Sequence, residues 1–138
     1  MSIADIYESG EQKQNKSHLE NLIAIAQVDG NIDETEKVLL AKFADRLNID
    51  RSTFNEMMNH VASYNVIPPF DKVDRYKMLY SLVSLSLADS VLDEKEVSLL
   101  ERYAIGLGYT EERANELIQK SISWVSNDIS FEEAFENI

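Results

Sequence analysis

Apolar residues recur every three to four positions along most of the chain, the spacing that places side chains on one face of an α-helix. Leu19, Leu22, Ile23 and Ala26 follow this spacing, and a second series begins after the Asp-Gly pair at 29–30. An Asp-Gly hairpin turn between strands needs alternating apolar residues on both sides, and they are lacking here. The pattern predicts an all-α fold.

The helical pattern occurs twice, at a constant offset of sixty residues, so that 22–47 aligns with 82–107. Self-similarity at a fixed period indicates a repeated structural unit. We therefore expect one domain over 16–138, preceded by a polar segment over 1–15. The domain should hold about seven helices: two similar three-helix halves, followed by one short helix. The expected ranges are 17–66 and 70–126 for the halves and 130–137 for the last helix.

Several short signals mark where the helices begin and end. Pro68 and Pro69 separate the halves, because the residue before a proline is pushed out of the helical region. Asn48 and Gly108 stand at equivalent positions after a helix, and both residue types tolerate the left-handed conformation that ends many helices. Thr110 is a predicted N-cap, and 130–133 reads as a capping box. Asp50 or Ser52 is expected to cap the third helix.

Charge narrows the set of partners. The formal net charge is −12, which repels phosphate backbones and anionic lipids and argues against nucleic-acid binding. Cations and basic protein surfaces are favoured instead. The chain has no cysteine, which excludes disulfides, thiolate zinc sites and cysteine nucleophiles.

The sequence also bears on location. The first ten residues lack the basic and apolar regions of a signal peptide. The apolar tract over 78–88 is about half of the roughly twenty residues that span a bilayer. We therefore expect a cytoplasmic protein that does not insert into a membrane.

Four of the repeated carboxylates have a structural explanation. Asp33 and Asp93 stand where an N-cap accepts hydrogen bonds from the amides of the first turn. Glu36 and Glu96 follow three residues later, where a capping box places a side chain that reaches back to the cap amide. On this interpretation the four residues stabilise helix starts.

Asp29 and Asp89 fit this explanation less well, because each falls at the carboxyl end of a helix, where the helix dipole disfavours an anion. Hydrogen bonds from the amides of the following turn offset that cost in one hypothesis. A bound cation offsets it in the other, since carboxylate oxygens are the ligands that Ca²⁺ and Mg²⁺ prefer. The candidate metal ligands are Asp29, Asp33, Glu36, Asp89, Asp93 and Glu96. The spacing differs from an EF-hand, whose twelfth position is Glu where this chain has Leu40.

The stretches 26–36 and 88–96 resemble the twice-occurring signature A-x-A-D-G-x-I-x-x-x-E of the TerB-like proteins. This family is named after the tellurite-resistance protein TerB and is similar to the amino-terminal domain of the membrane-anchored co-chaperone DjlA. The resemblance covers about 17–122. It implies an all-helical domain and a role in cation binding or in scaffolding stress-response complexes.

The two copies match the signature unequally. The resemblance extends to Asp29, Gly30, Ile32 and Glu36 in the first copy and to Asp89, Leu92 and Glu96 in the second. Ser90 replaces the glycine of the signature, and Val91 is apolar where Asn31 is polar. A ligand role is therefore better supported for the first copy.

Other catalytic signals are lacking. His18 and His60 stand alone, and the sequence has neither a glycine-rich phosphate loop nor a Gly-x-Ser-x-Gly elbow. We expect a non-enzymatic interaction or scaffold module with a protein partner and a stress-response role. The alternative is a divalent-cation sensor or buffer that uses the turns 29–36 and 89–96. The oligomeric state stays open.

Overall fold

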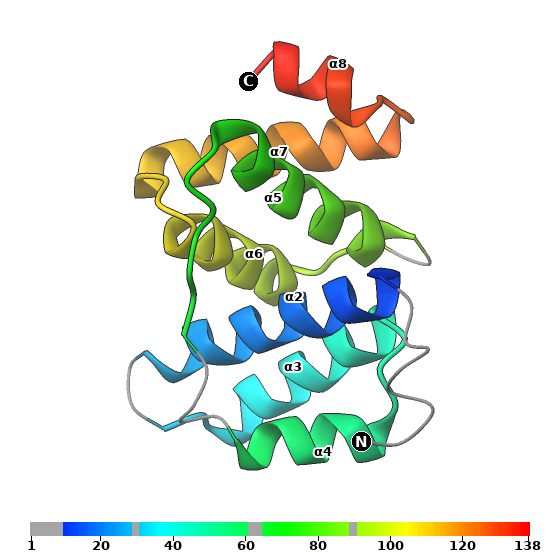
Figure 1. Cartoon of the computed structure of the whole chain (residues 1–138), viewed down its shortest axis with the longest axis vertical. Coiled ribbons are helices and arrows are strands. Elements are labelled where there is room, and N and C mark those ends of the chain that lie inside the picture. Colours follow the sequence, from blue (N-terminus) through cyan, green and yellow to red (C-terminus); the bar gives the residue numbers. More distant parts are fainter. Residues whose placement is uncertain (1–9, 29–30, 61–64, 89–90) are drawn as a thin grey trace.

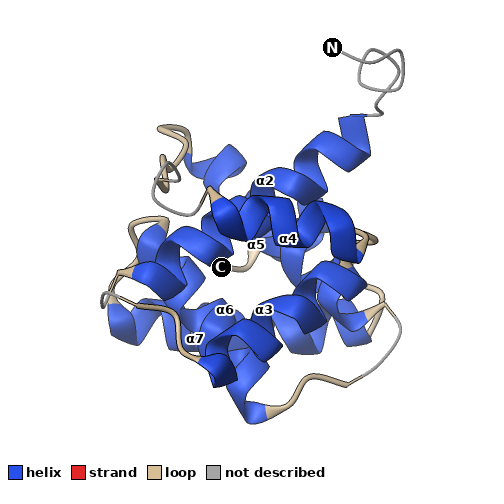
Figure 2. Cartoon of the chain, turned by 90° about the horizontal axis from the view of Figure 1, so that it is seen from below, coloured by secondary structure: helices blue, strands red, loops and turns tan. Residues whose placement is uncertain are grey.

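The computed structural model of the 138-residue chain describes residues 10–28, 31–60, 65–88 and 91–138. These residues form seven helices and no strand, which confirms the predicted all-α fold (Figures 1 and 2). In chain order, the helices are α2 (Gly10–Gln27), α3 (Glu34–Arg46), α4 (Arg51–Asn59), α5 (Lys72–Leu87), α6 (Glu94–Gly106), α7 (Glu111–Ser126) and α8 (Phe131–Glu136).

The three helices of the second half are stacked on the three helices of the first (Figure 1). Figure 1 shows α2, α3 and α4 at one end, α5, α6 and α7 above them, and α8 at the far end. Helices α2 and α6 pack together where the halves meet, and α3 also contacts α5. The buried apolar side chains form one cluster across both halves, with Leu22, Phe43, Leu79, Tyr103 and Leu117 among its members. The two halves therefore share a single core.

Several helix boundaries follow the sixty-residue offset, although α4 ends at Asn59 and α7 continues to Ser126. Helices α3 and α6 begin at Glu34 and Glu94, α4 and α7 begin at Arg51 and Glu111, and α2 and α5 end at Gln27 and Leu87. Asp50, not Ser52, caps α4, because its Oδ1 accepts from the Thr53 amide at 2.7 Å. Thr110 caps α7 as predicted. Ser130 caps α8, but the reciprocal bond from the Ser130 amide to the Glu133 side chain, which the predicted capping box requires, is absent between these two described residues.

The predicted ends of the second helix of each half are also confirmed. Asn48 has a φ of 58° and Gly108 a φ of 110°, so both adopt the left-handed conformation that closes a helix. Each lies two residues past the end of its helix, α3 or α6. Local sequence alone specifies this feature, since the residue type decides whether a positive φ is tolerated.

Helix α2 begins earlier than the polar sequence of 1–15 suggested. It starts at Gly10, and Asn15 is buried, with its Nδ2 donating to the Leu47 carbonyl oxygen at 3.1 Å. This bond joins α2 to the end of α3 across thirty-two residues of sequence. The apolar periodicity missed this part of α2, because a buried polar side chain supplies the contact.

Candidate functional site

The second acidic turn, residues 93–96, forms the predicted capping box. The Glu96 amide donates to Asp93 Oδ1 at 2.8 Å, and the Asp93 amide donates to Glu96 Oε1 at 3.3 Å. The hydrogen bond from the Glu96 amide is the main cause that holds the pKa of Asp93 below its usual value. Both carboxylates thus stabilise the start of α6, as the structural interpretation proposed.

Glu96 also contacts a cation from the other half of the molecule. Arg46, in the last turn of α3, places its Nε 2.7 Å from Glu96 Oε2. The two side chains are only 13% and 4% exposed, so this ion pair is largely shielded from water. Arg46 Nη1 also donates to the Ser86 carbonyl oxygen near the end of α5. One guanidinium therefore links α3, α5 and α6.

A second cation of α3 approaches the same turn at the surface. Lys42 Nζ lies 3.4 Å from Asp93 Oδ2, and both side chains are about half exposed, at 51% and 49%. Lys42 and Asp93 line a hollow of about 230 Å³ together with Thr35 and Lys95. Thr35 of the first acidic turn and Asp93 of the second therefore line the same hollow, and Lys42 lines it too.

The first acidic turn, residues 33–36, is only partly engaged. The Glu36 amide donates to Asp33 Oδ1 at 2.8 Å, so the predicted N-cap is present. Between these two described residues the reciprocal bond of a capping box is absent, which corrects the prediction for Glu36. Glu36 Oε2 is buried and has no hydrogen-bond partner among the described residues. This carboxylate lacks the arginine that Glu96 has.

Asp29 and Asp89, the two predicted ligands that precede the turns, lie outside the described residues. Within the ranges that the structure describes, no three acidic, histidine or cysteine side chains gather in a way that could hold a metal ion. Of the four described carboxylates, those of Asp33, Asp93 and Glu96 bond to backbone amides at the starts of α3 and α6, and that of Glu36 does not.

The carboxyl ends of α2 and α5 each receive an arginine from the opposite half. Arg102 Nη2 of α6 donates to the Ile25 carbonyl oxygen at 2.9 Å, and Arg46 donates to that of Ser86. A cation at a helix carboxyl end interacts favourably with the dipole. The sequence interpretation missed both arginines, because the offset gives no signal: Gly106 stands opposite Arg46, and Lys42 opposite Arg102.

His18 is part of the interior. It is 1% exposed, and its Nδ1 lies 3.1 Å from the Tyr103 hydroxyl of α6. Burial lowers the pKa of His18 from 6.5 to about 4 and raises the pKa of Tyr103 to about 12. Both groups are therefore neutral near pH 7, and they form a polar contact between α2 and α6.

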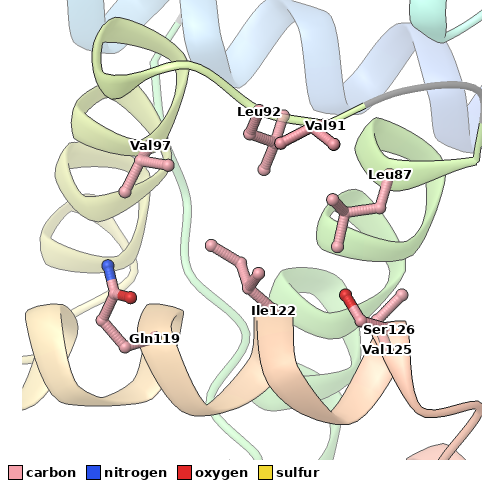
Figure 3. Close-up of a pocket in the computed structure, with 8 residues that line it drawn as sticks. All are labelled: Leu87, Val91, Leu92, Val97, Gln119, Ile122, Val125 and Ser126. Carbon is pink, nitrogen blue, oxygen red and sulfur yellow. The ribbon is translucent and has the colours of Figure 1, made fainter.

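An apolar hollow of about 550 Å³ lies beside the second acidic turn (Figure 3). Val91 is apolar where the first half has Asn31, but the periodicity of the sequence does not reveal the hollow. Val91 is 87% exposed. The residues that line it are Leu87, Val91, Leu92, Val97, Gln119, Ile122, Val125 and Ser126.

The family model described as "Tellurite resistance protein TerB" matches residues 2–59. The match supports a TerB-like assignment. It includes the first acidic turn, whereas the second acidic turn lies beyond the matched residues. No curated protein and no solved structure matches the chain. None of the helices that the structure describes is long and apolar enough to cross a membrane.

Proposed function

We propose that this TerB-like chain is a non-enzymatic, cytoplasmic interaction module that binds a protein partner and helps to assemble stress-response complexes. One contrast in the structure carries the proposal. The candidate carboxylate Glu96 is held inside the fold by Arg46, whereas the open hollow next to its turn is lined mostly by aliphatic side chains. Exposed apolar surface of this kind is typical of interaction sites.

The charge of the chain indicates the chemistry of the partner. A net charge of −12 attracts basic surfaces and repels acidic ones. Among the described residues, most acidic side chains make no ion pair within the chain. Association with the partner should therefore weaken as the salt concentration rises, because salt screens charges at the surface.

Site-specific photocrosslinking tests this function. A photoreactive amino acid is placed at one of two strongly exposed apolar positions, Phe70 or Val91, or at the exposed Glu112 of α7 as a control. In cells that produce the protein, we expect a discrete crosslinked product from at least one apolar position and none from the control. The absence of a product at both apolar positions contradicts the proposal, as does a measured catalytic turnover by the purified chain.

A divalent-cation site at the first acidic turn is the second candidate function. The observation that favours it is Glu36 Oε2, a buried oxygen without a partner among the described residues, in the same turn as Asp33. Carboxylate oxygens of this kind suit Ca²⁺ or Mg²⁺. At the second acidic turn the fit is poor, because Arg46 already neutralises Glu96. A sensor or buffer role therefore concerns the first turn and the neighbouring Asp29.

Thermal unfolding with and without the cation tests this candidate. A ligand that binds only the folded state stabilises it by about 2.7 kcal/mol at a hundredfold excess over Kd. We expect CaCl₂ or MgCl₂ to raise the melting temperature of the wild type, and Asp29→Asn to remove that increase. The matched control is Asp89→Asn, which should respond like the wild type. A melting temperature that neither cation changes rules this function out.

A further inference from the structure

The apolar hollow beside the second acidic turn, called here the apolar groove, is formed by four segments. Figure 3 shows Leu87 from α5, Leu92 from the connection to α6, Val97 from α6 and Ile122 from α7 around one open space. Six of its eight lining residues are aliphatic, and the two polar ones, Gln119 and Ser126, belong to α7. The groove thus offers apolar contact along its length and hydrogen bonds on one side.

Four positions of this surface are apolar where the first half is polar, although Leu87, Val97 and Val125 also pack against the core. At the sixty-residue offset, Leu87, Val91, Val97 and Val125 correspond to Gln27, Asn31, Lys37 and Asn65. Gln27 and Leu87 end α2 and α5, and Lys37 and Val97 lie near the starts of α3 and α6, whereas Asn65 lies beyond the end of α4 and Val125 lies within α7. An exposed valine such as Val91 contributes little to the core, so the structure itself does not explain why this position is apolar.

Two exposed acidic residues lie close in sequence to the lining of the groove. Glu94 and Asp128, both exposed, lie within two residues of lining positions and make no ion pair among the described residues. Of the nearby cations, Lys120 is paired with Glu116 at 2.8 Å, and Lys95 borders the neighbouring hollow with Asp93. A ligand that fills the groove with apolar side chains gains further attraction from basic residues at its edges.

The architecture also favours a helical ligand over an extended one. The described part of the chain contains no strand, so it offers no sheet edge to which an extended peptide could add. Lining residues on α7 recur at 119, 122 and 125–126, a stripe of about 10 Å along one helix face. A second helix laid beside this stripe presents apolar residues at matching intervals.

We propose that the apolar groove binds an amphipathic helix of a partner protein, with apolar residues three to four positions apart and Lys or Arg beside them. The proposal rests on the interaction function proposed above, to which it adds the surface and the chemistry of the partner. The valines and leucines of the groove bury the apolar face of that helix, and Glu94 and Asp128 attract its basic residues.

The test is a selection from a displayed library of random peptides long enough for about four helical turns. The wild-type protein should enrich peptides with helical apolar spacing and an excess of Lys and Arg. Val91→Asn and Val97→Lys introduce the residue types of the first half. Each should lower the affinity for the selected peptides about tenfold or more. Val38→Lys, at an apolar side chain of α3 that is 58% exposed and outside the groove, is the matched control and should not change binding.

Each outcome decides the question. Val91→Asn changes a side chain that is 87% exposed, so it should keep the fold even if Val97→Lys does not, and thermal unfolding of both variants checks this. Peptides that bind wild type and Val91→Asn equally overturn the groove but leave the interaction function intact. Enriched peptides that are acidic or lack helical spacing overturn the stated partner chemistry. If no peptide is enriched, the groove proposal is rejected, and the crosslinking experiment decides separately whether the interaction function fails with it.

Discussion

The two acidic turns have nearly the same sequence and different surroundings. Both place an Asp at the N-cap and a Glu three residues later, yet Glu96 Oε2 forms an ion pair with Arg46, whereas Glu36 Oε2 has neither a hydrogen bond nor an ion pair among the described residues. The difference comes from the opposite half. Helix α3 carries Arg46 toward the second turn, but Gly106 occupies the equivalent place in α6. A repeated motif therefore need not have a repeated role, because the partners of its side chains come from residues that are not repeated.

The largest effect should come from removing the arginine that distinguishes the turns. Arg46→Met leaves the Glu96 carboxylate buried without its cation, and loss of one member of a buried pair costs about 3–5 kcal/mol. Urea unfolding measures the loss. Lys42→Met, which removes the half-exposed contact with Asp93, is the control and should cost much less. Equal losses for both variants would show that burial of the Arg46 pair has no special importance.

The loss of stability at acidic pH that comes from His18 in the core should be separable from the loss that comes from the acidic turns. His18 has a pKa of about 4 in the folded protein against 6.5 unfolded, so the unfolded state binds the proton first. Stability should therefore fall as the pH drops from about 6.5 to about 4, by about 3 kcal/mol from this group. His18→Gln should flatten the unfolding free energy over that window. If His18→Gln keeps the pH dependence of the wild-type unfolding free energy, the loss of stability at acidic pH comes from other groups.

Loss of the N-caps should affect the two turns unequally. Asp33→Ala removes one hydrogen bond to an amide and should cost about 0.5–2 kcal/mol, with Asp33→Ser restoring most of it. Asp93→Ala should cost more than Asp33→Ala, because it also removes the contact with Lys42 and disrupts the capping box. Denaturant midpoints of the three variants give the ranking. A greater loss of stability in Asp33→Ala than in Asp93→Ala would contradict this prediction.

Glu36→Gln should change metal-free stability by no more than about 0.5 kcal/mol or raise it slightly, because no cation among the described residues pairs with this carboxylate. Glu96→Gln should destabilise the protein clearly, since it leaves Arg46 without its anion. Thermal unfolding in a chelator compares the two. A marked loss of stability in Glu36→Gln would show that the Glu36 carboxylate also has a stabilising partner, as Glu96 has.

The smallest expected effect is at acidic pH. The pKa of Asp93 is lowered in the fold, mainly by the hydrogen bond from the Glu96 amide, so its contribution is present above the unfolded pKa. That contribution is lost as the pH falls through the lowered value. Asp93→Asn cannot titrate and should show a weaker loss of stability below about pH 4. His18 is common to both proteins, so subtracting their unfolding free energies isolates Asp93.

Local chemistry was sufficient to predict the elements of this fold. Spacing of apolar residues indicates the helices, Asp33, Asp93 and Thr110 specify where helices begin, and Asn48 and Gly108 specify where they end. Each of these features depends on residues within one or two helical turns, which is why a linear pattern contains them. The early start of α2 is the exception, because it depends on Asn15 meeting the carbonyl of Leu47.

Only the tertiary structure decided what the candidate residues do. Glu96 meets Arg46 across fifty residues of sequence, Arg102 reaches the end of α2, and Val91 and Val125 border one groove from different segments. These relations depend on how α2 and α6 pack and on which side chains the opposite half supplies at that contact. The short repeated motif does not specify that packing, so the sequence alone predicted the same capping role for Glu36 and Glu96, whereas the fold makes one internal ion pair and one unpaired carboxylate.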